Sequence, residues 1–497
     1  MMGVALKPLA DLLPGVPGVP GLAISDLTLD AGSVRPGGAF VALRGTMRHG
    51  LEFAAEAEAR GAVAVLWDPA EAPATMPVLG TMTGIPVVGL RARLGHMADR
   101  FFETPSARLA IAGVTGTNGK TTCAWLTAAA LGRLGIAAAY SGTLGVGCPP
   151  AVRPGSHTTP DVLRLHRQLA ELVAADASHV AMEVSSHALE QGRVDGVRLR
   201  IAAFTNLSRD HLDYHGTMER YAAAKARLFA LPGIEHAVIN MDDAAGRGCA
   251  AALPHGVALT AIGTDPRACR TAPRRVVAQH AISTPAGLEL EVDTHAGSAR
   301  LTSPLIGDFN TENLLVVLGV LLAFEVPLAD AAVALATTGA PPGRMETFAA
   351  PGGPLCVVDY AHSPDALAKA LGAARRHCRG RLLVVFGCGG ERDSGKRGLM
   401  GAIAERLADL VVVTDDNPRG ESPDAIVAMI LEGMRRPEHV RVEHDRALAI
   451  ALAYAQAAAG DVVLVAGKGH EDYQLTASGR RPFSDRAELG RLTGVAA

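Results

Sequence analysis

The sequence has no closely spaced pair of cysteines, no large excess of charge of one sign and no long hydrophobic run. Its seven cysteines are scattered along 497 residues, and none belongs to a Cys-x-x-Cys motif. This pattern excludes a zinc knuckle and a disulfide framework, and it favours a reducing compartment. With 47 basic and 50 acidic residues, the formal net charge is −3. The chain lacks the basic composition that nucleic-acid binding requires, so we expect no nucleic-acid partner.

Membrane association has no support in the sequence either. The longest apolar run, residues 314–324, stops at Glu325 and is too short to cross a bilayer, so it predicts a buried helix. Residues 1–21 carry Lys7 and Asp11 and are interrupted by prolines, unlike the basic and then apolar layout of a signal peptide. We expect a cytoplasmic protein without a membrane partner, and a monomer.

The length predicts about three domains, and a hydrophobic content of 48% is enough to form large cores. Residues 1–105 are expected to form a small mixed α/β domain. Its apolar segments 37–43 and 62–68 predict strands, and residues 51–61 between them predict a helix that ends at Gly61.

Residues 106–338 predict a central domain built on a largely parallel sheet, because apolar runs alternate there with helical stretches. One predicted strand ends near residue 115, and others lie at 179–186, 201–208 and 236–240. Residues 275–305 alternate between apolar and polar side chains, which predicts an appended antiparallel β region.

Proline and glycine concentrate at residues 337–354, which predicts a second boundary. Residues 339–497 then contain four apolar strands, each followed by a loop of small or polar residues. This order predicts a Rossmann-like, doubly wound α/β domain. In such domains ligands bind where the loops leave the carboxyl ends of the strands.

Residues 114–122, Val-Thr-Gly-Thr-Asn-Gly-Lys-Thr-Thr, lie between a predicted strand and a predicted helix. Backbone N–H groups of such a glycine-rich turn converge on phosphate oxygens, and the helix N-terminus adds positive potential. Lys120 would reach the β- and γ-phosphates, and Thr121 would bind Mg²⁺. Val114 departs from the usual Gly or Ala. A turn that uses its glycines only for packing is the alternative, but the strand, the Gly-Lys-Thr and the helix together favour the phosphate loop.

Acidic residues and histidines follow the next strand ends. Glu183 ends a strand, where a carboxylate could hold Mg²⁺ or its water shell. A place at the start of the helix that Ser185 or Ser186 opens is an equally good interpretation. Two aspartates and two histidines then fall within six positions, namely Asp210, His211, Asp213 and His215. Lys225 follows on a predicted helix, where a lysine is usually at the surface.

The loops of the last domain combine three kinds of polar group. Position 392 is arginine, so the loop after residue 386 fails the Gly-x-Gly-x-x-Gly fingerprint and a dinucleotide site is weakly supported. The same segment is cationic, with Arg392, Lys396 and Arg397. The next strands end in Asp-Asp-Asn-Pro-Arg at 415–419 and in Gly-Lys-Gly-His-Glu at 467–471. Guanidinium, amide and carboxylate groups suit a zwitterionic amino acid. A solvated rim with internal salt bridges is the alternative.

Eight segments resemble motifs of the Mur ligase family, in order, over roughly residues 25–490. They are GTNGKTT, EVSSHALEQGRV, NLSRDHLDYHGTMERYAAAKARLF, GRME, DYAHSPDAL, GCGGERDSGKR, DNPR and GKGHEDYQ. The resemblance implies an ATP-dependent amide ligase of peptidoglycan synthesis. It would add meso-2,6-diaminopimelate to the D-Glu γ-carboxylate of UDP-MurNAc-L-Ala-D-Glu through an acyl phosphate. It also implies a UDP-sugar domain, a P-loop ATPase domain and an amino-acid-binding domain, which match residues 1–105, 106–338 and 339–497.

The resemblance further implies which residues form the site. The implied catalytic residues are Lys120, Glu183, His211 and Lys225. Two Mg²⁺ ions would be held by Thr121, Glu183, His211 and Lys225, the last as a carbamate. The implied ATP contacts are Gly116, Thr117, Asn118, Gly119, Lys120, Thr121, Thr122, Asn310, Arg344 and His362. The implied contacts to the UDP-linked dipeptide are Thr46, Met47, Arg48, His49, His157, Thr158, Thr159, Ser185, Gln191 and Arg193. The implied diaminopimelate contacts are Arg392, Asp416, Asn417, Pro418, Arg419, Gly467 and Glu471.

Arg419 marks the diaminopimelate-adding type, because a guanidinium can clamp the second carboxylate that lysine lacks. The sequence departs from the family at Ala31-Gly32, where Ser-Arg is usual, and at His157, where Asn is usual. The alternatives are a folylpolyglutamate synthase, a lysine-adding ligase and a P-loop binding protein without ligase activity. A further alternative is a degenerate ligase whose hold on the UDP group is weakened at Ala31-Gly32.

Overall fold

The computed structural model describes residues 6–45, 47–155 and 157–495. The chain divides into two compact units. The first consists of Met1–Lys120, Gly135–Ile239 and Asp243–Leu259, and the second of Thr121–Leu134, Asn240–Asp242 and Thr260–Ala497. Among the described residues, no helix combines the length and the hydropathy that a membrane span needs.

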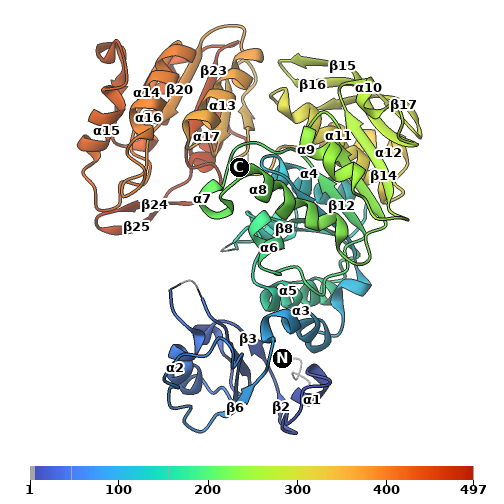
Figure 1. Ribbon diagram of the computed structural model, residues 1–497. Coiled ribbons are helices and arrows are strands. Elements are labelled where there is room, and N and C mark those ends of the chain that lie inside the picture. Colours follow the sequence, from blue (N-terminus) through green and yellow to red (C-terminus); the bar gives the residue numbers. More distant parts are fainter. Residues whose placement is uncertain (1–5, 46, 156, 496–497) are drawn as a thin grey trace. The chain divides into compact units, whose positions relative to one another are not determined.

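The first unit begins with a small mixed α/β region (Figure 1). Its four parallel strands are β3 (Leu27–Thr28), β4 (Ala39–Ala42), β5 (Ala64–Trp67) and β6 (Thr83–Pro86). The predicted helix is α2 (Ala54–Ala59), which a 3₁₀ turn precedes and Gly61 follows. The remaining elements are β1 (Lys7–Pro8), β2 (Ala23–Ile24), α1 (Leu9–Leu12) and α3 (Leu90–Phe101).

Alternate side chains of these strands enter two different cores. Val41 and Leu66 pack with residues of α1 and α3, whereas Phe40 and Val65 pack with residues of α2. Successive residues of a strand point to opposite faces, and both faces are covered here. A continuous apolar run is therefore required, as the segments 37–43 and 62–68 have.

The rest of the first unit is a largely parallel sheet, as predicted. Its strands lie in the order β10-β9-β8-β11-β7-β12-β13, and only β9 and β10 run antiparallel to their neighbours. They are β7 (Ala110–Thr115), β8 (Ala138–Gly142), β9 (Gly145–Cys148), β10 (Ala151–Arg153), β11 (His179–Glu183), β12 (Ile201–Phe204) and β13 (His236–Asn240). The helices are α5 (Val162–Ala174), α6 (Ser186–Glu190), α7 (Leu212–His215), α8 (Met218–Ala226) and α9 (Ala244–Ala251). Helix α4 (Lys120–Arg133) follows β7 after a short loop.

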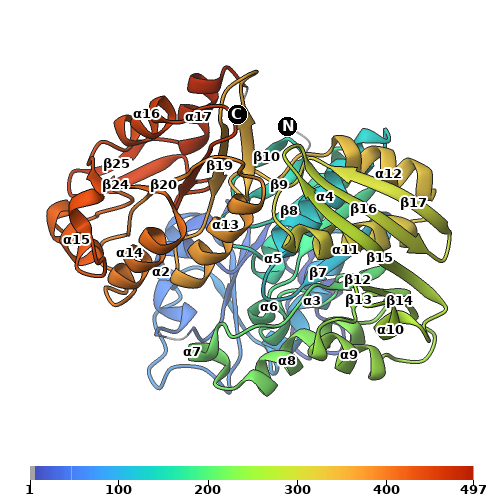
Figure 2. The same cartoon turned by 90° about the horizontal axis from the view of Figure 1, so that it is seen from above.

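The second unit contains the predicted antiparallel region, whose long strands lie side by side in Figure 2. It consists of β15 (Arg274–Thr284), β16 (Gly287–Thr294) and β17 (Gly297–Ser303), and β14 (Ala258–Gly263) pairs in parallel with β15. Helix α11 (Phe309–Ala323) packs on β15, and α12 (Leu328–Thr337) packs on β17. The apolar run 314–324 lies in the buried part of α11, as expected. A short helix, α10 (Pro266–Cys269), precedes β15.

The C-terminal part of the second unit is a six-stranded sheet in the order β18-β19-β23-β20-β21-β22. All neighbours are parallel except β18 and β19. The strands are β18 (Glu346–Ala349), β19 (Leu355–Asp359), β20 (Leu382–Phe386), β21 (Leu410–Val413), β22 (Arg441–Val442) and β23 (Val462–Ala466). The helices are α13 (Pro364–Arg376), α14 (Lys396–Leu407), α15 (Pro423–Leu431), α16 (Arg446–Gln456) and α17 (Asp485–Thr493). A hairpin of β24 (Tyr473–Thr476) and β25 (Gly479–Pro482) follows the sheet.

Helices cover both faces of this sheet. Val384 and Phe386 pack with residues of α13, α14 and α15, whereas Leu383 and Val385 pack with residues of α16 and α17. The strands β23, β20 and β21 are neighbours and parallel, so their carboxyl ends lie along one edge. The three polar loops predicted from the sequence therefore leave the sheet side by side, which is where a doubly wound domain binds its ligand.

Two helical glycines test how tightly this domain is packed. An added Cβ at Gly401 in α14 would lie 2.2 Å from the carbonyl oxygen of Ile430, whereas one at Gly372 in α13 would meet nothing within 4 Å. We expect Gly401→Ala to lower the free energy of unfolding by about 1–3 kcal/mol through overpacking. Gly372→Ala should raise it by about 0.5–1 kcal/mol through helix propensity. Scanning calorimetry of both variants measures the difference, and a Gly401→Ala variant as stable as the wild type would contradict the close packing.

Candidate active site

The loop between β7 and α4 has the geometry of a phosphate loop. Gly116 and Gly119 adopt φ values of +150° and +85°, which residues other than glycine rarely adopt. An added Cβ at Gly116 would lie 1.8 Å from Thr205 Oγ1. The residues that follow β12 hold the loop, since Thr117 N donates to Asn206 O at 2.8 Å. The predicted strand, turn and helix are thus confirmed at this position.

Two lysine side chains converge on this loop. Lys120 Nζ donates to the carbonyl oxygens of Gly116 and Thr117, both at 2.8 Å. Lys225 Nζ donates to the same oxygen of Gly116 at 2.6 Å and lies 4.4 Å from the centroid of the Tyr221 ring. Lys225 is buried, so the expectation of a surface lysine is wrong. Burial, together with the charge of Lys120, lowers the pKa of Lys225 to about 6, so its amine is mostly uncharged at neutral pH.

A polar cavity of about 280 Å³ adjoins the two lysines. Its lining residues are Lys120, His157, Thr158, Thr159, Ser185, Ser186, His187, Arg193, His211, Tyr221 and Lys225. None of the described residues that line it is acidic, and the basic side chains of Lys120 and Arg193 contribute to its wall. A cavity with this lining attracts anions.

Glu183 lies at the end of β11 and is buried. Its carboxylate accepts hydrogen bonds from the Tyr140 hydroxyl at 2.5 Å and from the Thr143 backbone N–H at 2.8 Å. The Thr143 hydroxyl also donates to it at 3.3 Å and lies 3.0 Å from Thr158 Oγ1. Ser185 caps α6 by accepting from the N–H of Ala188. The carboxylate therefore fastens the end of β8 to the cavity wall.

The structure brings most of the predicted dipeptide contacts together. Arg193 donates to Thr159 O at 2.9 Å and to Gln191 Oε1 at 2.7 Å. The Thr159 hydroxyl donates to Glu183 O at 2.9 Å and accepts from Ser185 N at 3.2 Å. Four of the residues predicted for the dipeptide thus form one connected group at the cavity, and its lining also includes His157 and Thr158.

The predicted N-terminal contacts lie elsewhere. Met47 is exposed, Arg48 pairs with Glu52 at 2.8 Å, and His49 is buried and caps a 3₁₀ turn. None of these three belongs to the described residues that line the cavity. Thr46 lies outside the described residues.

The departing segment Ala31-Gly32 has a regular local structure. It lies in a 3₁₀ turn that Asp30 caps, with the Asp30 carboxylate accepting from Gly32 N at 3.0 Å and from Ser33 Oγ at 2.5 Å. The turn is therefore stable without the Ser-Arg that is usual in the family.

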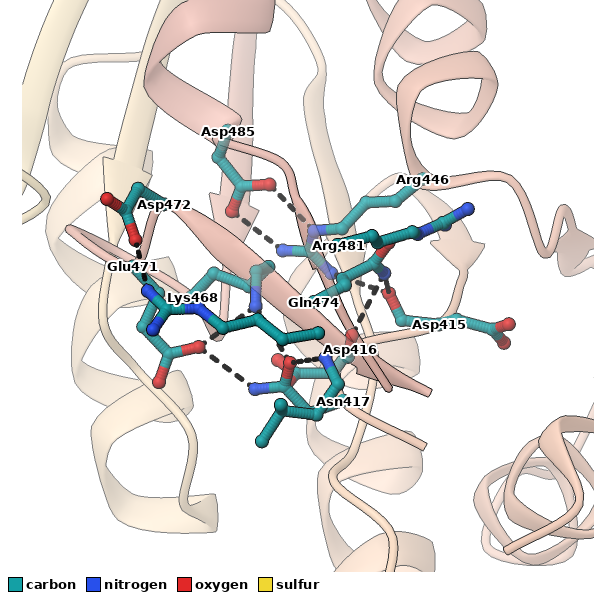
Figure 3. A network of polar contacts seen from close by, with 12 residues as sticks. Asp415, Asp416, Asn417, Arg446, Lys468, Glu471, Asp472, Gln474, Arg481 and Asp485 are labelled. Carbon is teal, nitrogen blue, oxygen red and sulfur yellow. Dashed lines mark hydrogen bonds and ion pairs between the residues drawn. The ribbon is translucent and has the colours of Figure 1, made fainter. Parts of the chain in front are cut away.

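Three polar loops lie at the carboxyl edge of the six-stranded sheet, and Figure 3 shows polar contacts between two of them, the loops after β21 and β23. Asn417 Nδ2 donates to Glu471 Oε2 at 2.9 Å, and Lys468 Nζ donates to the same oxygen at 2.9 Å. Lys468 also donates to Asn417 Oδ1 at 3.1 Å. In the same loop cluster, Arg446 and Asp485 form a buried bidentate ion pair at 2.7 and 2.8 Å. The predicted residues Asn417 and Glu471 are thus in direct contact, although 54 positions separate them.

Arg419 is anchored through its backbone and its guanidinium. Its N–H donates to Leu475 O at 2.9 Å, and Nη1 donates to Gly390 O at 2.8 Å. An added Cβ at Gly389 would lie 3.0 Å from Arg419 Nη1 and 3.8 Å from Arg392 Cγ, so both arginines flank this glycine. Two guanidinium groups in one loop cluster suit a ligand that carries carboxylates.

Asp416 is buried beneath the same loops. Burial raises the pKa of its carboxyl, while Arg446 and Lys468 oppose the rise. An added Cβ at Gly467 would lie 2.5 Å from Asp416 Oδ2, so only glycine fits between this carboxylate and the loop after β23. Pro418 directly precedes Arg419, and its carbonyl accepts from Glu421 N.

The prediction that Lys396 and Arg397 belong to the cationic loop is wrong. Both residues open helix α14, and Lys396 donates to the carbonyl oxygen of His362 at 2.7 Å. Arg397 is buried and forms a bidentate pair with Glu421 at 2.7 and 2.9 Å. The partner lies 24 residues away, so no local pattern indicates that this arginine is structural.

The residues predicted for the nucleotide outside the phosphate loop separate into two groups. The Arg344 guanidinium lies 4.9 Å from the centroid of the Tyr360 ring, and the His362 ring lies 4.7 Å from it. Asn310 instead donates to Ile306 O at 2.8 Å and accepts from Asn313 at 2.8 Å within the start of α11. Arg344 and His362 thus surround one aromatic ring, whereas Asn310 stabilises the helix.

Three family profiles match the chain in order. They are described as Mur ligase family, catalytic domain (residues 23–102), Mur ligase middle domain (114–321) and Mur ligase, glutamate ligase domain (343–469). Together they cover most of the sequence. The chain belongs to the Mur ligase family. The predicted fold class, with a small N-terminal α/β region, a central parallel sheet with an antiparallel extension and a Rossmann-like C-terminal sheet, is confirmed.

Individual Mur ligases are similar over nearly their whole length. A protein of Xylella fastidiosa (strain Temecula1) named UDP-N-acetylmuramoyl-L-alanyl-D-glutamate--2,6-diaminopimelate ligase is 51% identical over 479 residues, 96% of this chain and 95% of that protein. A protein of the same name from Pseudomonas aeruginosa is 49% identical over 470 residues, 95% of each chain. A solved structure of a ligase with this name is 35% identical, covers 99% of both chains and gives a TM-score of 0.72.

A more distant structure, folylpolyglutamate synthase of Mycobacterium tuberculosis, gives a TM-score of 0.59 at 19% identity and covers 76% of this chain and 92% of that chain. At this identity the likeness shows a shared fold alone.

Several residues of both sites were not predicted. His187 lines the cavity with its ring 5.0 Å from that of His211 and 4.2 Å from that of Tyr214. At the six-stranded sheet, Lys468 and Arg446 are buried within the cluster of polar loops. His187 and Lys468 lie inside recognised motifs, so the motifs mark the right segments. Arg446 lies in no such motif, and only the fold reveals that it contacts this loop cluster.

The Arg397–Glu421 pair predicts a pH dependence of stability. The hydrogen bonds from Arg397 lower the pKa of Glu421 from 4.5 to about 2. A carboxyl whose pKa is lowered on folding stabilises the protein above its unfolded value, and that contribution is lost as the pH falls through the folded value. Glu421→Gln should therefore lower the thermal midpoint relative to the wild type at pH 6, and the difference should shrink between pH 4.5 and 2. Equal midpoints at pH 6 would contradict this role of the pair.

Proposed function

We propose that this Mur ligase joins meso-2,6-diaminopimelate to the D-Glu γ-carboxylate of UDP-MurNAc-L-Ala-D-Glu, with hydrolysis of ATP to ADP and phosphate. Relatives named for this reaction, at 48–51% identity over nearly the full length, support the proposal. The observation that carries the choice of amino acid is the Arg419 guanidinium, held beside Arg392 at the edge of the C-terminal sheet. Diaminopimelate has a second carboxylate for such a group, and lysine has none.

The proposal divides the chain into three parts. Residues 1–105 bind the UDP-sugar, residues 106–338 bind ATP and the dipeptide, and residues 339–497 bind the incoming amino acid. The phosphate loop supports the second role and the three polar loops support the third. A reaction between ATP and a UDP-linked precursor agrees with the cytoplasm as its location.

The first step joins two anions, so their repulsion must be offset. The γ-carboxylate attacks the γ-phosphorus of ATP, the bond to the bridging oxygen breaks, and ADP leaves as an acyl phosphate forms. Lys120 lies at the loop that would cradle the phosphates, and Arg193 and His211 line the same cavity. Positive groups fixed before the substrates arrive stabilise charge that develops in the transition state.

Among the described residues, no group of three His, Cys, Asp or Glu side chains could hold a metal ion, and a carboxyl group on Lys225 would add a carboxylate to the donors beside the phosphate loop. The buried amine of Lys225 is mostly uncharged at neutral pH, which is the form that reacts with carbon dioxide. A carbamate at Lys225, His211, the Thr121 hydroxyl and Glu183 would then be the ligands of two ions. When bound, Mg²⁺ supplies positive charge to the phosphates. Glu183 Oε1 accepts hydrogen bonds from Tyr140 and Thr143, and the carboxylate has further lone pairs with which it could bind an ion.

The second step forms the amide. The free amine of diaminopimelate attacks the acyl carbon, a tetrahedral intermediate forms, and phosphate leaves. Glu471 and Asp416 offer negative charge to an ammonium, while Arg392 and Arg419 offer guanidinium groups to carboxylates. A P-loop binding protein would not need such a pocket.

Phosphate release tests the proposal. Purified protein receives ATP, Mg²⁺ and UDP-MurNAc-L-Ala-D-Glu, together with either diaminopimelate or L-lysine. We expect release that requires both the dipeptide and diaminopimelate, and a diaminopimelate kcat/KM that falls by about tenfold to a thousandfold in Arg419→Ala, because a bidentate contact is lost.

Equal rates with lysine would contradict the role of Arg419 but leave the ligase reaction. No release with either amine would contradict the ligase proposal and favour a degenerate ligase, with Ala31-Gly32 as the first segment to restore to Ser-Arg.

A further inference from the structure

In the loop after β23, the side chain of Lys468 points into the protein interior. Lys468 lies between Gly467 and Gly469, whose φ values are +120° and +54°. Its side chain is 0% exposed, although lysine is rarely buried without a partner. The diaminopimelate contacts implied by resemblance include its neighbour Gly467 and nearby Glu471, but no role is attached to Lys468 itself.

The ammonium group of Lys468 bridges two side chains of the amino-acid pocket. It donates to Asn417 Oδ1 at 3.1 Å and to Glu471 Oε2 at 2.9 Å. Asn417 Nδ2 donates to the same Glu471 oxygen at 2.9 Å, and Leu475 N donates to Asn417 Oδ1 at 2.9 Å. The three side chains therefore form a closed triangle, which Figure 3 shows from close by.

This triangle fixes which way each pocket side chain faces. Glu471 Oε2 receives two donors, and no described residue donates to its other oxygen, Oε1. Asn417 Oδ1 receives two donors as well, so the orientation of its amide is determined. A carboxylate held by one oxygen keeps the other available to a ligand.

Charge balance gives the same conclusion. The pocket contains the carboxylates of Asp416 and Glu471, and Asp416 is buried beside Gly467. Two carboxylates in one site repel each other, and a nearby cation offsets that repulsion. Lys468 supplies that cation from the buried side of the site, where a ligand cannot displace it.

We propose that Lys468 is a positioning residue for the incoming amino acid: it holds Asn417 and Glu471 so that Glu471 Oε1 receives the ligand's ammonium group. The inference rests on the proposed function and deepens it. Lys468 acts through its two partners, and its own ammonium stays buried throughout the reaction. It therefore affects the binding of diaminopimelate more than that of ATP or of the UDP-linked dipeptide.

The test is the kinetic profile of Lys468→Met, which keeps most of the volume of the side chain but removes its donors. We expect the KM for diaminopimelate to rise about tenfold to a hundredfold, because two buried acceptors lose a donor. The KM values for ATP and the dipeptide should stay within about twofold. Lys468→Gln, which is uncharged and one bond shorter but still donates, should raise the KM for diaminopimelate less. If the Met variant does not fold, an unchanged KM in the Gln variant overturns the proposal.

Arg381→Met is the matched control. Arg381 pairs with the buried carboxylate of Asp461 at 3.0 Å, at the start of β20 and hence at the opposite end of the strands from the pocket. It should lower the thermal midpoint and leave the KM for diaminopimelate unchanged, which separates lost stability from lost positioning.

The outcomes distinguish the two claims. A wild-type protein without diaminopimelate-dependent phosphate release overturns the proposed function and the inference with it. A normal wild type together with an unchanged KM for diaminopimelate in Lys468→Met overturns the inference alone. An equal rise of all three KM values also overturns it, because a general structural role would have that effect.

Discussion

The carbonyl oxygen of Gly116 accepts hydrogen bonds from two lysine side chains, and the chemistry of the first unit depends on this arrangement. Two ammonium groups cannot share one acceptor at close range without raising each other's free energy. The buried one, Lys225, loses its charge, while Lys120 lies at the entrance to α4. The two lysines therefore contribute differently: Lys120 offers charge to phosphates, and Lys225 offers a reactive neutral amine.

The C-terminal sheet uses buried charge differently. Lys468, Arg446 and Arg397 are each buried, and each donates to a carboxylate at less than 3 Å. Buried ion pairs contribute little to net stability because desolvation offsets their attraction, but they fix geometry. Around the edge of this sheet such pairs determine where the pocket side chains point. Rigid polar groups in defined orientations are what recognition of a zwitterion requires.

The fold class was accessible from the sequence because strands buried on both faces must be continuously apolar, as in residues 382–386 and 462–466. The phosphate loop was accessible because its spacing has a local geometric cause. Contacts between distant segments were not accessible. The sequence placed Arg397 in a ligand-binding loop, but Glu421 binds it from the loop that precedes α15. Its place on a predicted helix favoured a surface position for Lys225, and only the resemblance singled it out, because nothing local shows that this side of α8 is buried. His187 lies inside a recognised motif, whereas Arg446 became visible only when the strands were assembled.

Transfer of oxygen from the dipeptide to phosphate tests the central claim most directly, namely that the cationic cavity joins a carboxylate to the γ-phosphate of ATP. UDP-MurNAc-L-Ala-D-Glu labelled with ¹⁸O in the γ-carboxylate is incubated with ATP, Mg²⁺, diaminopimelate and the protein, and the phosphate is analysed by mass spectrometry. An acyl phosphate predicts phosphate that carries one labelled oxygen for each amide formed. Unlabelled phosphate, with ATP consumed and the label retained in the dipeptide, would contradict the account.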